Sequence, residues 1–393
     1  MTPTNPNRSE TLGIGVLGAG AFGLFALQHF LQVPGVRLVA LAGTHREAAL
    51  AMARRFGIEQ MDTPESLVQR PDVELVYIAT PPFLHHPQAR MALEAGKHVL
   101  CEKPLALTTR EATELVELAR ARNLLCVANL IQRYNPLFDA IRSLIAEEVL
   151  GACLHGYFEN YAADEGLPPR HWFWDRSKSG GIFLEHGVHF FDLFAGWLGP
   201  GRVVAAQSVA RPGSGVEEQV HCTVRYPGDV LVNFYHGFTQ TARMDRQELR
   251  LLFELGDVTL EEWIPVRATV RAVVDEARTR RLMELFPGAR LDILAVYGGR
   301  DREAMGRHKK VDLSQRIELR WGLGQEKMRT YGELLRALLF DQIRWIRDPS
   351  HARKITEENG WQSVAMAETA TRLAGETAPA EDPHRVSPRV NLP

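Results

Sequence analysis

A glycine-rich turn near the start of the chain constrains the fold more than any other feature. Residues 12–17 are apolar or glycine, a G-x-G-x-x-G pattern follows, and an apolar helical pattern begins within it. A strand, a glycine turn and a helix in this order bind the pyrophosphate of a dinucleotide at the positive end of the helix. The stretch therefore predicts a dinucleotide site. The expected contacts are Gly18, Gly20, Ala21, Phe22 and Gly23.

The first third of the chain alternates apolar runs with helical patterns. The runs expected to be strands are residues 36–42, 74–79, 97–101 and 124–128. Thr63, followed by proline, and Thr108, followed three residues later by glutamate, are helix start signals. Strands and helices alternating at this spacing predict a doubly wound parallel sheet. We therefore expect a Rossmann domain over residues 12–131, after a flexible N-terminus at 1–11.

The pattern changes near residue 151, where strand-like segments follow one another. The expected strands are 151–162, 203–211, 216–226, 229–238, 247–255 and 257–263, with hairpin turns at Pro227-Gly228 and Gly256-Asp257. One helix, 183–198, interrupts them. Residues 266–320 look enlarged: we expect a strand, a helix near 280–285, a strand near 291–297, a charged loop at 300–310 and a strand at 316–321. Amphipathic helices are expected at 327–346 and 356–373.

These patterns predict an α/β protein. An N-terminal Rossmann doubly wound parallel sheet is followed by a C-terminal α+β domain with a large, mostly antiparallel open sheet. The second domain, for substrate and oligomerisation, is expected over 132–350. A C-terminal helix at 351–375 is expected to pack back on the Rossmann domain, and a flexible tail follows at 376–393.

Charge and cysteine content exclude several classes of partner. A net charge of −2 gives no reason to expect nucleic acid or an anionic membrane as a partner. The N-terminal residues carry no apolar signal core, and the four cysteines lie far apart without a C-x-x-C pair. We therefore expect a cytoplasmic protein with reduced thiols, no membrane partner and no zinc site.

Three clusters of polar and aromatic residues stand out beyond the glycines. Glu102-Lys103-Pro104 follows one expected strand and Thr80-Pro81 follows another, at the sheet edge where such folds bind ligands. On the helix expected at 183–198, Glu185 and His189 are four residues apart, so they share a face and can hydrogen-bond. An aromatic stretch with Trp172 and Trp174 comes just before this helix.

Together, these motifs resemble the Gfo/Idh/MocA family, which includes glucose–fructose oxidoreductase and inositol dehydrogenase. The resemblance covers residues 12–262 and the helices at 327–373. It implies that Lys103, Glu185 and His189 form the active site, that Glu102 and Lys103 approach the cofactor with Thr80 and Pro81, and that the chain forms a homodimer or homotetramer. Glu185 departs from the family's usual aspartate, and the neighbouring His186 is also atypical. The implied substrate contacts are Arg133, Tyr134, Trp172, Trp174 and His186.

The chemistry that the resemblance implies needs a proton acceptor and a cation beside the reacting oxygen. Lys103 and His189 both qualify, and the sequence does not decide between them. The favoured function is a nicotinamide-dependent oxidoreductase that acts on a sugar, cyclitol or related polyol. The alternatives are a redox-neutral glycosidase or epimerase that retains its cofactor, and a non-catalytic dinucleotide-binding regulator. We assign no metal, because one short cluster of His186, His189 and Glu185 has no distant partner.

The end of the second expected strand bears on the choice between NADP and NAD. A carboxylate there would bind the ribose hydroxyls of NAD, but Gly43 occupies the position. Thr44, His45 and Arg46 follow, and a threonine hydroxyl with a guanidinium could receive the 2′-phosphate of NADP. Alternatively, Thr44 only caps a helix running to about residue 56. The sequence favours NADP and keeps NAD open.

Overall fold

A computed structural model describes residues 11–18, 20–43, 50–51, 54–57, 62–164 and 166–377. Its N-terminal unit contains a five-stranded parallel sheet in the order β2-β1-β3-β4-β5. The strands are β1 Leu12–Leu17, β2 Val36–Ala42, β3 Leu75–Ile78, β4 His98–Cys101 and β5 Cys126–Ala128. All residues of β1 and β3 are buried, as in a sheet covered on both faces. The predicted Rossmann sheet is confirmed.

The helices of this unit begin where the sequence placed start signals. They are α1 Ala21–Phe30, α3 Pro64–Gln69, α4 His85–Glu94 and α5 Thr109–Arg122. Thr63 and Ser66 exchange side chain to backbone hydrogen bonds at the start of α3. Thr108 accepts from the N–H of Glu111 at the start of α5. Most of the helix expected after Thr44 lies outside the described residues.

A nine-stranded sheet dominates the second unit, in the order β13-β16-β12-β11-β10-β6-β9-β8-β7. Its strands are β6 Cys153–Ala163, β7 Arg202–Ala210, β8 Glu217–Tyr226, β9 Val230–Gln240, β10 Arg246–Phe253, β11 Gly256–Glu261, β12 Arg267–Val274, β13 Arg290–Val296 and β16 Gln315–Gly322. Neighbouring strands are antiparallel except β6 and β9, which pair in parallel. The mostly antiparallel sheet is confirmed.

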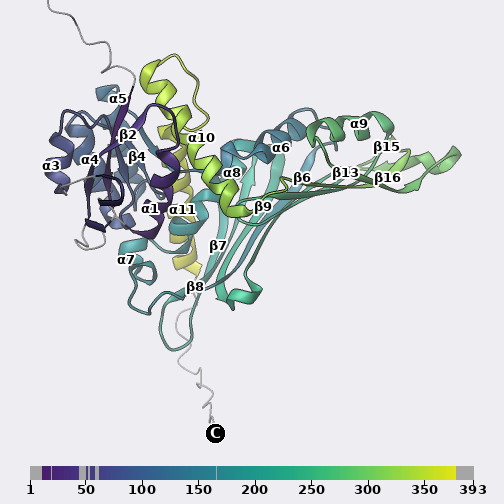
Figure 1. Cartoon of the computed structure of the whole chain (residues 1–393). Coiled ribbons are helices and arrows are strands. Elements are labelled where there is room, and N and C mark those ends of the chain that lie inside the picture. Colours follow the sequence, from purple (N-terminus) through teal and green to yellow (C-terminus); the bar gives the residue numbers. More distant parts are fainter. Residues whose placement is uncertain are drawn as a thin grey trace, which may run out of the picture.

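Helices α6 Pro136–Ala146, α8 Val188–Leu198 and α9 Glu276–Leu285 lie along one face of the large sheet (Figure 1). On α8, Phe190 stacks on Phe158 of β6, and Phe194 meets Phe234 of β9 edge-on. These rings are fully buried, and burying one such side chain is worth about 1.5–3 kcal/mol. The aromatic layer therefore fixes α8, and the segment before it, against the sheet.

Two turn expectations were wrong. Residues 300–310 are not a charged loop: β14 Glu303–Gly306 and β15 Lys309–Asp312 form a hairpin whose turn residues Arg307 and His308 have positive φ. Every residue of β14 is exposed, so no apolar alternation marks it. The turn between β10 and β11 lies before Gly256, because Gly256 already pairs with Phe253.

The last two helices, α10 Lys327–Arg347 and α11 Glu357–Thr377, connect the two units. On α10, Arg336 donates to His29 of α1 at 2.9 Å. On α11, Trp361 donates to Thr113 of α5 at 2.9 Å. In Figure 1, α11 runs between the Rossmann unit and β7 and β8 of the large sheet. No helix among the described residues has both the length and the apolar character needed to cross a membrane. All four cysteines are free thiols.

Candidate functional site

The glycine turn leaves room for a phosphate group where the sequence predicted one. Gly18 has φ +107°, and a Cβ on it would lie 2.5 Å from the carbonyl oxygen of Ala79. Gly20 is the N-cap of α1, and a Cβ there would have no described atom within 4 Å. No side chain caps the start of α1 among the described residues. The open N-terminus, with room above Gly20, fits the pyrophosphate of a dinucleotide.

The loop after β3 is tied to the loop after β4 by one buried histidine. His85 Nε2 lies 2.7 Å from the carbonyl oxygen of Thr80, and its Nδ1 lies 2.6 Å from that of Pro104. Thr80 also donates through its hydroxyl to Gln88. Thr80 and Pro81 thus stand at the same sheet edge as the glycine turn. Thr44, His45 and Arg46 lie outside the described residues.

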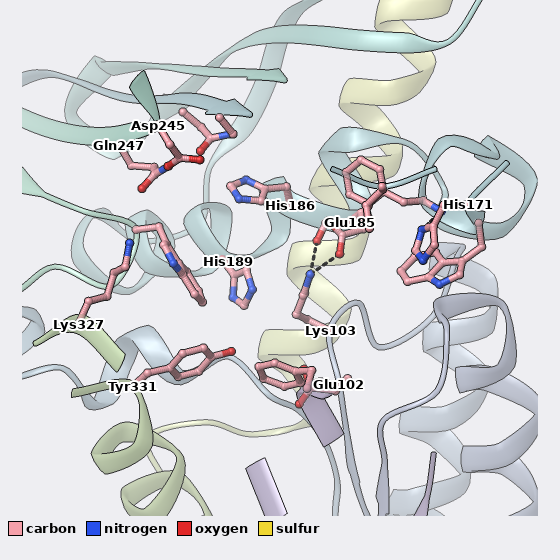
Figure 2. A pocket seen from close by; sticks show the side chains of 17 residues that line it. Glu102, Lys103, His171, Glu185, His186, His189, Asp245, Gln247, Lys327 and Tyr331 are labelled. Carbon is pink, nitrogen blue, oxygen red and sulfur yellow. Dashed lines mark hydrogen bonds and ion pairs between the residues drawn. The ribbon is translucent and has the colours of Figure 1, made fainter. Parts of the chain in front are cut away.

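A cavity of about 580 Å³ opens where the two units meet (Figure 2). Among the side chains expected at the site, Phe22, Glu102, Lys103, Trp172, Glu185, His186 and His189 line it. The remaining lining residues are Asn160, Ala162, Leu167, His171, Phe173, Asp245, Gln247, Trp263, Lys327 and Tyr331. The motif residues from the two units therefore share one cavity.

Lys103 enters the cavity from the loop after β4. Its Nζ donates to Glu185 Oε1 at 2.5 Å and to the carbonyl oxygen of Glu185 at 2.8 Å. The preceding Glu102 is buried and accepts from the Tyr77 hydroxyl and the Asn129 amide, each at 2.6 Å. Burial raises the pKa of Glu102. Glu102 thus anchors the loop from which Lys103 reaches into the cavity.

The helix that carries Glu185 and His189 opens differently from the expectation. Residues Phe183–Gly187 form a π-helical turn before α8, a feature often found at functional sites. The wider turn changes the offset between Glu185 and His189, and Glu185 binds Lys103. The expected hydrogen bond between Glu185 and His189 is therefore replaced. His189 Nδ1 is buried with no partner among the described residues.

Three buried histidines of this region, His186, His189 and His236, are uncharged at neutral pH. Burial, reinforced by the charge of Lys103, lowers the pKa of His189 well below its usual value and that of His186 to about 3. Burial also lowers the pKa of His236, which lies on β9. His186 Nδ1 and His236 Nδ1 are 2.9 Å apart, so one ring donates to the other. The site therefore places the neutral imidazoles of His186 and His189 beside the Lys103 amino group.

Three of the expected substrate contacts, Arg133, Tyr134 and Trp174, do not line the cavity. Arg133 binds the carboxylate of Asp192 through Nε and Nη2, and the Tyr134 hydroxyl donates to Asp341. Both hold helices together. Trp174 packs against Phe238 and beneath the Arg211 guanidinium. Of the 3-10 turn Trp172–Trp174, Trp172 and Phe173 line the cavity and Trp174 does not.

Sequence reasoning missed the cavity wall supplied by the large sheet and α10. Gln247 of β10 pairs with Asn160 of β6, and Asn160 pairs with His236 of β9, so the three form a row across the sheet. Lys327 and Tyr331 come from α10. Alternation along each strand predicts which residues share a face, but the register between distant strands has no local signal.

No metal centre is evident in the described part of the chain. No group of three or more histidine, cysteine, aspartate or glutamate side chains there could hold a metal ion.

Comparisons with known proteins agree with this architecture. The model of an oxidoreductase family with an NAD-binding Rossmann fold matches residues 12–130, and that of the Gfo/Idh/MocA C-terminal domain matches residues 138–259. A 1,5-anhydro-D-fructose reductase of Ensifer adhaerens is 33% identical over 57% of this chain and 69% of its own. A dTDP-3,4-didehydro-2,6-dideoxy-alpha-D-glucose 3-reductase of Saccharopolyspora spinosa is 31% identical over 67% of this chain and 81% of its own.

A solved structure shows the same fold over nearly the whole chain. It is a levoglucosan dehydrogenase in complex with NADH and L-sorbose, with a TM-score of 0.73 and 21% identity. The match covers 93% of this chain and 97% of that chain. The chain belongs to the Gfo/Idh/MocA family of oxidoreductases, with an NAD-binding Rossmann domain at its N-terminus.

Proposed function

We propose that this oxidoreductase interconverts a secondary alcohol and a ketone on a sugar, cyclitol or related polyol. The observation that carries the proposal is the placement of Lys103 in one cavity with Glu185 and His189, at the edge of the sheet that also bears the glycine turn. The carbohydrate names of the relatives support this substrate class. Gly43 in place of a carboxylate, followed by Arg46, supports NADP over NAD.

Lys103 is the proposed proton-transfer group. A bound nicotinamide would take the hydride from the reacting carbon in oxidation and return it in reduction. Lys103, when neutral, accepts the hydroxyl proton in oxidation; as an ammonium, it donates a proton to the carbonyl oxygen in reduction. Glu185 holds the lysine by accepting from its Nζ. His189 is a weaker base because burial lowers its pKa.

Replacing Lys103 by methionine tests this assignment. Methionine keeps most of the side chain's volume and removes the transferable proton, so Lys103→Met should lower turnover by at least ~10²-fold. Cofactor affinity, measured by fluorescence titration with NADH and NADPH, should change little. Turnover equal to that of the wild type would remove Lys103 from the chemistry. Consumption of added cofactor with a panel of sugars and polyols distinguishes net oxidation or reduction from redox-neutral chemistry.

A further inference from the structure

Resting on the proposed function, we propose that Asn160, Gln247 and Asp245 form the subsite that selects the substrate. The geometry points to a neutral polyhydroxylated ring that places neighbouring hydroxyls against Asn160 and Gln247, with anionic sugars excluded by Asp245. Figure 2 shows Asp245 and Gln247 on the far side of His186 from Lys103. The subsite is therefore separate from the group proposed to transfer the proton.

The first observation is that two buried amide side chains have hydrogen-bonding atoms without a partner among the described residues. Asn160 is only 1% exposed, yet neither its Oδ1 nor its Nδ2 has a partner among the described residues. Gln247 is 7% exposed, and its Oε1 is likewise unpartnered. Leaving such groups buried and unbonded is costly, and native proteins rarely do so without a reason. Both residues line the cavity, so their amides can pair with a ligand there once they turn towards it.

The kind of unused group indicates the kind of ligand. Asn160 offers one acceptor and one donor from the same amide, and a pair of neighbouring hydroxyls can both donate to and accept from it. The Nε2 of Gln247 donates to Asp245 Oδ1 at 2.7 Å, which leaves its Oε1 as an acceptor. An acceptor suits a hydroxyl or an amine, whereas an ionised carboxylate or a phosphate dianion has no proton to donate to it.

The charges along the cavity favour a neutral ligand. Lys103 is paired with Glu185, and Lys327 donates to Glu262 at 2.7 Å, so both lysines are already neutralised by carboxylates. Asp245 accepts from Gln247 and from the N–H of Ala163. Within the described part of the chain, no lysine, arginine or histidine forms an ion pair with Asp245. An anionic group bound beside Gln247 would therefore meet the carboxylate of Asp245, which is exposed and has no such ion pair.

The test measures binding and turnover separately on the full chain. Direct binding is measured by calorimetry on Lys103→Met with bound NADPH or NADH, and kinetics on the wild type. The probes are myo-inositol, D-glucose and D-galactose, with D-glucuronate, D-galacturonate and glucose 6-phosphate as anionic counterparts. At least one neutral probe should bind at least ~10-fold more tightly than its anionic counterpart. Failure of every neutral probe to bind would overturn the subsite.

Variants assign the effect to residues. Asn160→Leu and Gln247→Leu should each raise Kd and KM at least ~10-fold, with a smaller change in kcat. Asp245→Asn should reduce, by at least ~10-fold, the factor by which a neutral probe binds more tightly than its anionic counterpart (the neutral-to-anionic ratio). Asn233→Leu removes an amide from the other face of the sheet, where Asn233 accepts from Thr223, and should not alter the ratio. Asn160→Ser is the second variant if Asn160→Leu does not fold.

The two proposals fail in different ways. Unchanged polyol binding in both leucine variants, or an unchanged neutral-to-anionic ratio in Asp245→Asn, would contradict the subsite. Selective polyol binding without any consumption of added cofactor would leave the subsite standing and contradict the proposed net oxidation or reduction.

Discussion

At the scale of single residues, the length of one side chain decides how the catalytic groups meet. Glu185 stands where the family usually has aspartate, and it reaches Lys103 with its carboxylate while its own carbonyl oxygen accepts from the same Nζ. Both acceptors that hold the Lys103 Nζ therefore belong to one residue, Glu185. A carboxylate one methylene shorter would be drawn back by roughly one C–C bond, over 1 Å. The additional methylene therefore sets the position of Lys103 rather than that of His189.

Shortening Glu185 tests this interpretation. Glu185→Asp should lower kcat/KM at least ~10-fold, about 1.4 kcal/mol of transition-state stabilisation, because a misplacement of ~1 Å can cost as much as ~10²-fold. Glu185→Gln keeps the length but removes the charge that pairs with Lys103, so it separates the contribution of length from that of charge. An aspartate variant as active as the wild type would show that the longer side chain is incidental.

At the scale of elements, helix starts were predictable and the form of the catalytic helix was not. Thr63 and Thr108 cap their helices through bonds that depend on residues three positions away, so a short stretch of sequence contains the whole signal. The π-helical turn at Phe183–Gly187 has no such local signature. It depends on contacts with residues distant in sequence, Lys103 of the Rossmann unit and His236 of β9.

Helix α8 is further secured by a buried ion pair. Asp192 accepts from Arg133 at 2.8 Å and from Asn359 of α11 at 3.1 Å. Asp192→Ala leaves the Arg133 guanidinium, 16% exposed, without its partner. We expect the free energy of unfolding to fall by about 3 kcal/mol in urea denaturation, since breaking one side of a buried pair typically costs ~3–5 kcal/mol.

Two matched variants separate lost charge pairing from lost packing. Asn359→Ala removes a neutral donor to Asp192 together with the acceptor of the Thr356 N–H and hydroxyl, and should cost about 2 kcal/mol. Arg133→Met combined with Asp192→Ala removes both charges and should recover part of the loss. A double variant no more stable than Asp192→Ala alone would show that the unpaired guanidinium is not the source of the instability.

At the scale of the whole molecule, the site lies where the two units meet. This explains why several of its residues could not be predicted from the sequence. Lys103 and His189 belong to motifs that can be recognised along the chain, and the fold brings both to one cavity. Asn160 and Gln247 face that cavity only because β6 and β10 pair in one particular register. Lys327 reaches it only because α10 returns to pack on α1. Such residues become visible once the tertiary structure is known.

A histidine that packs against α10 has a different pKa in the folded and the unfolded state. His98 of β4 meets the ring of Trp345 of α10 edge-on, and its Nδ1 accepts from the N–H of Leu125 at 3.1 Å. An imidazolium cannot accept that bond. Burial, aided by the charges of Arg347 and Arg353 and opposed by Glu74 and Glu357, lowers the pKa of His98 to about 4.

This pKa predicts an acid sensitivity that one substitution removes. Unfolded His98 titrates near the ordinary value of 6.5, so below that pH the unfolded state binds the extra proton and the folded state does not. Stability from neutral His98 is therefore fully present above pH ~6.5 and is lost as the pH falls towards ~4, by up to about 3 kcal/mol. His98→Asn keeps an acceptor near the Nδ1 position and does not titrate. Urea unfolding of both proteins from pH 7.5 to 4 should show that the free energy of unfolding falls more for the wild type than for His98→Asn. If the free energy of unfolding of the wild type minus that of His98→Asn stays constant, or grows as the pH falls, the assignment is contradicted.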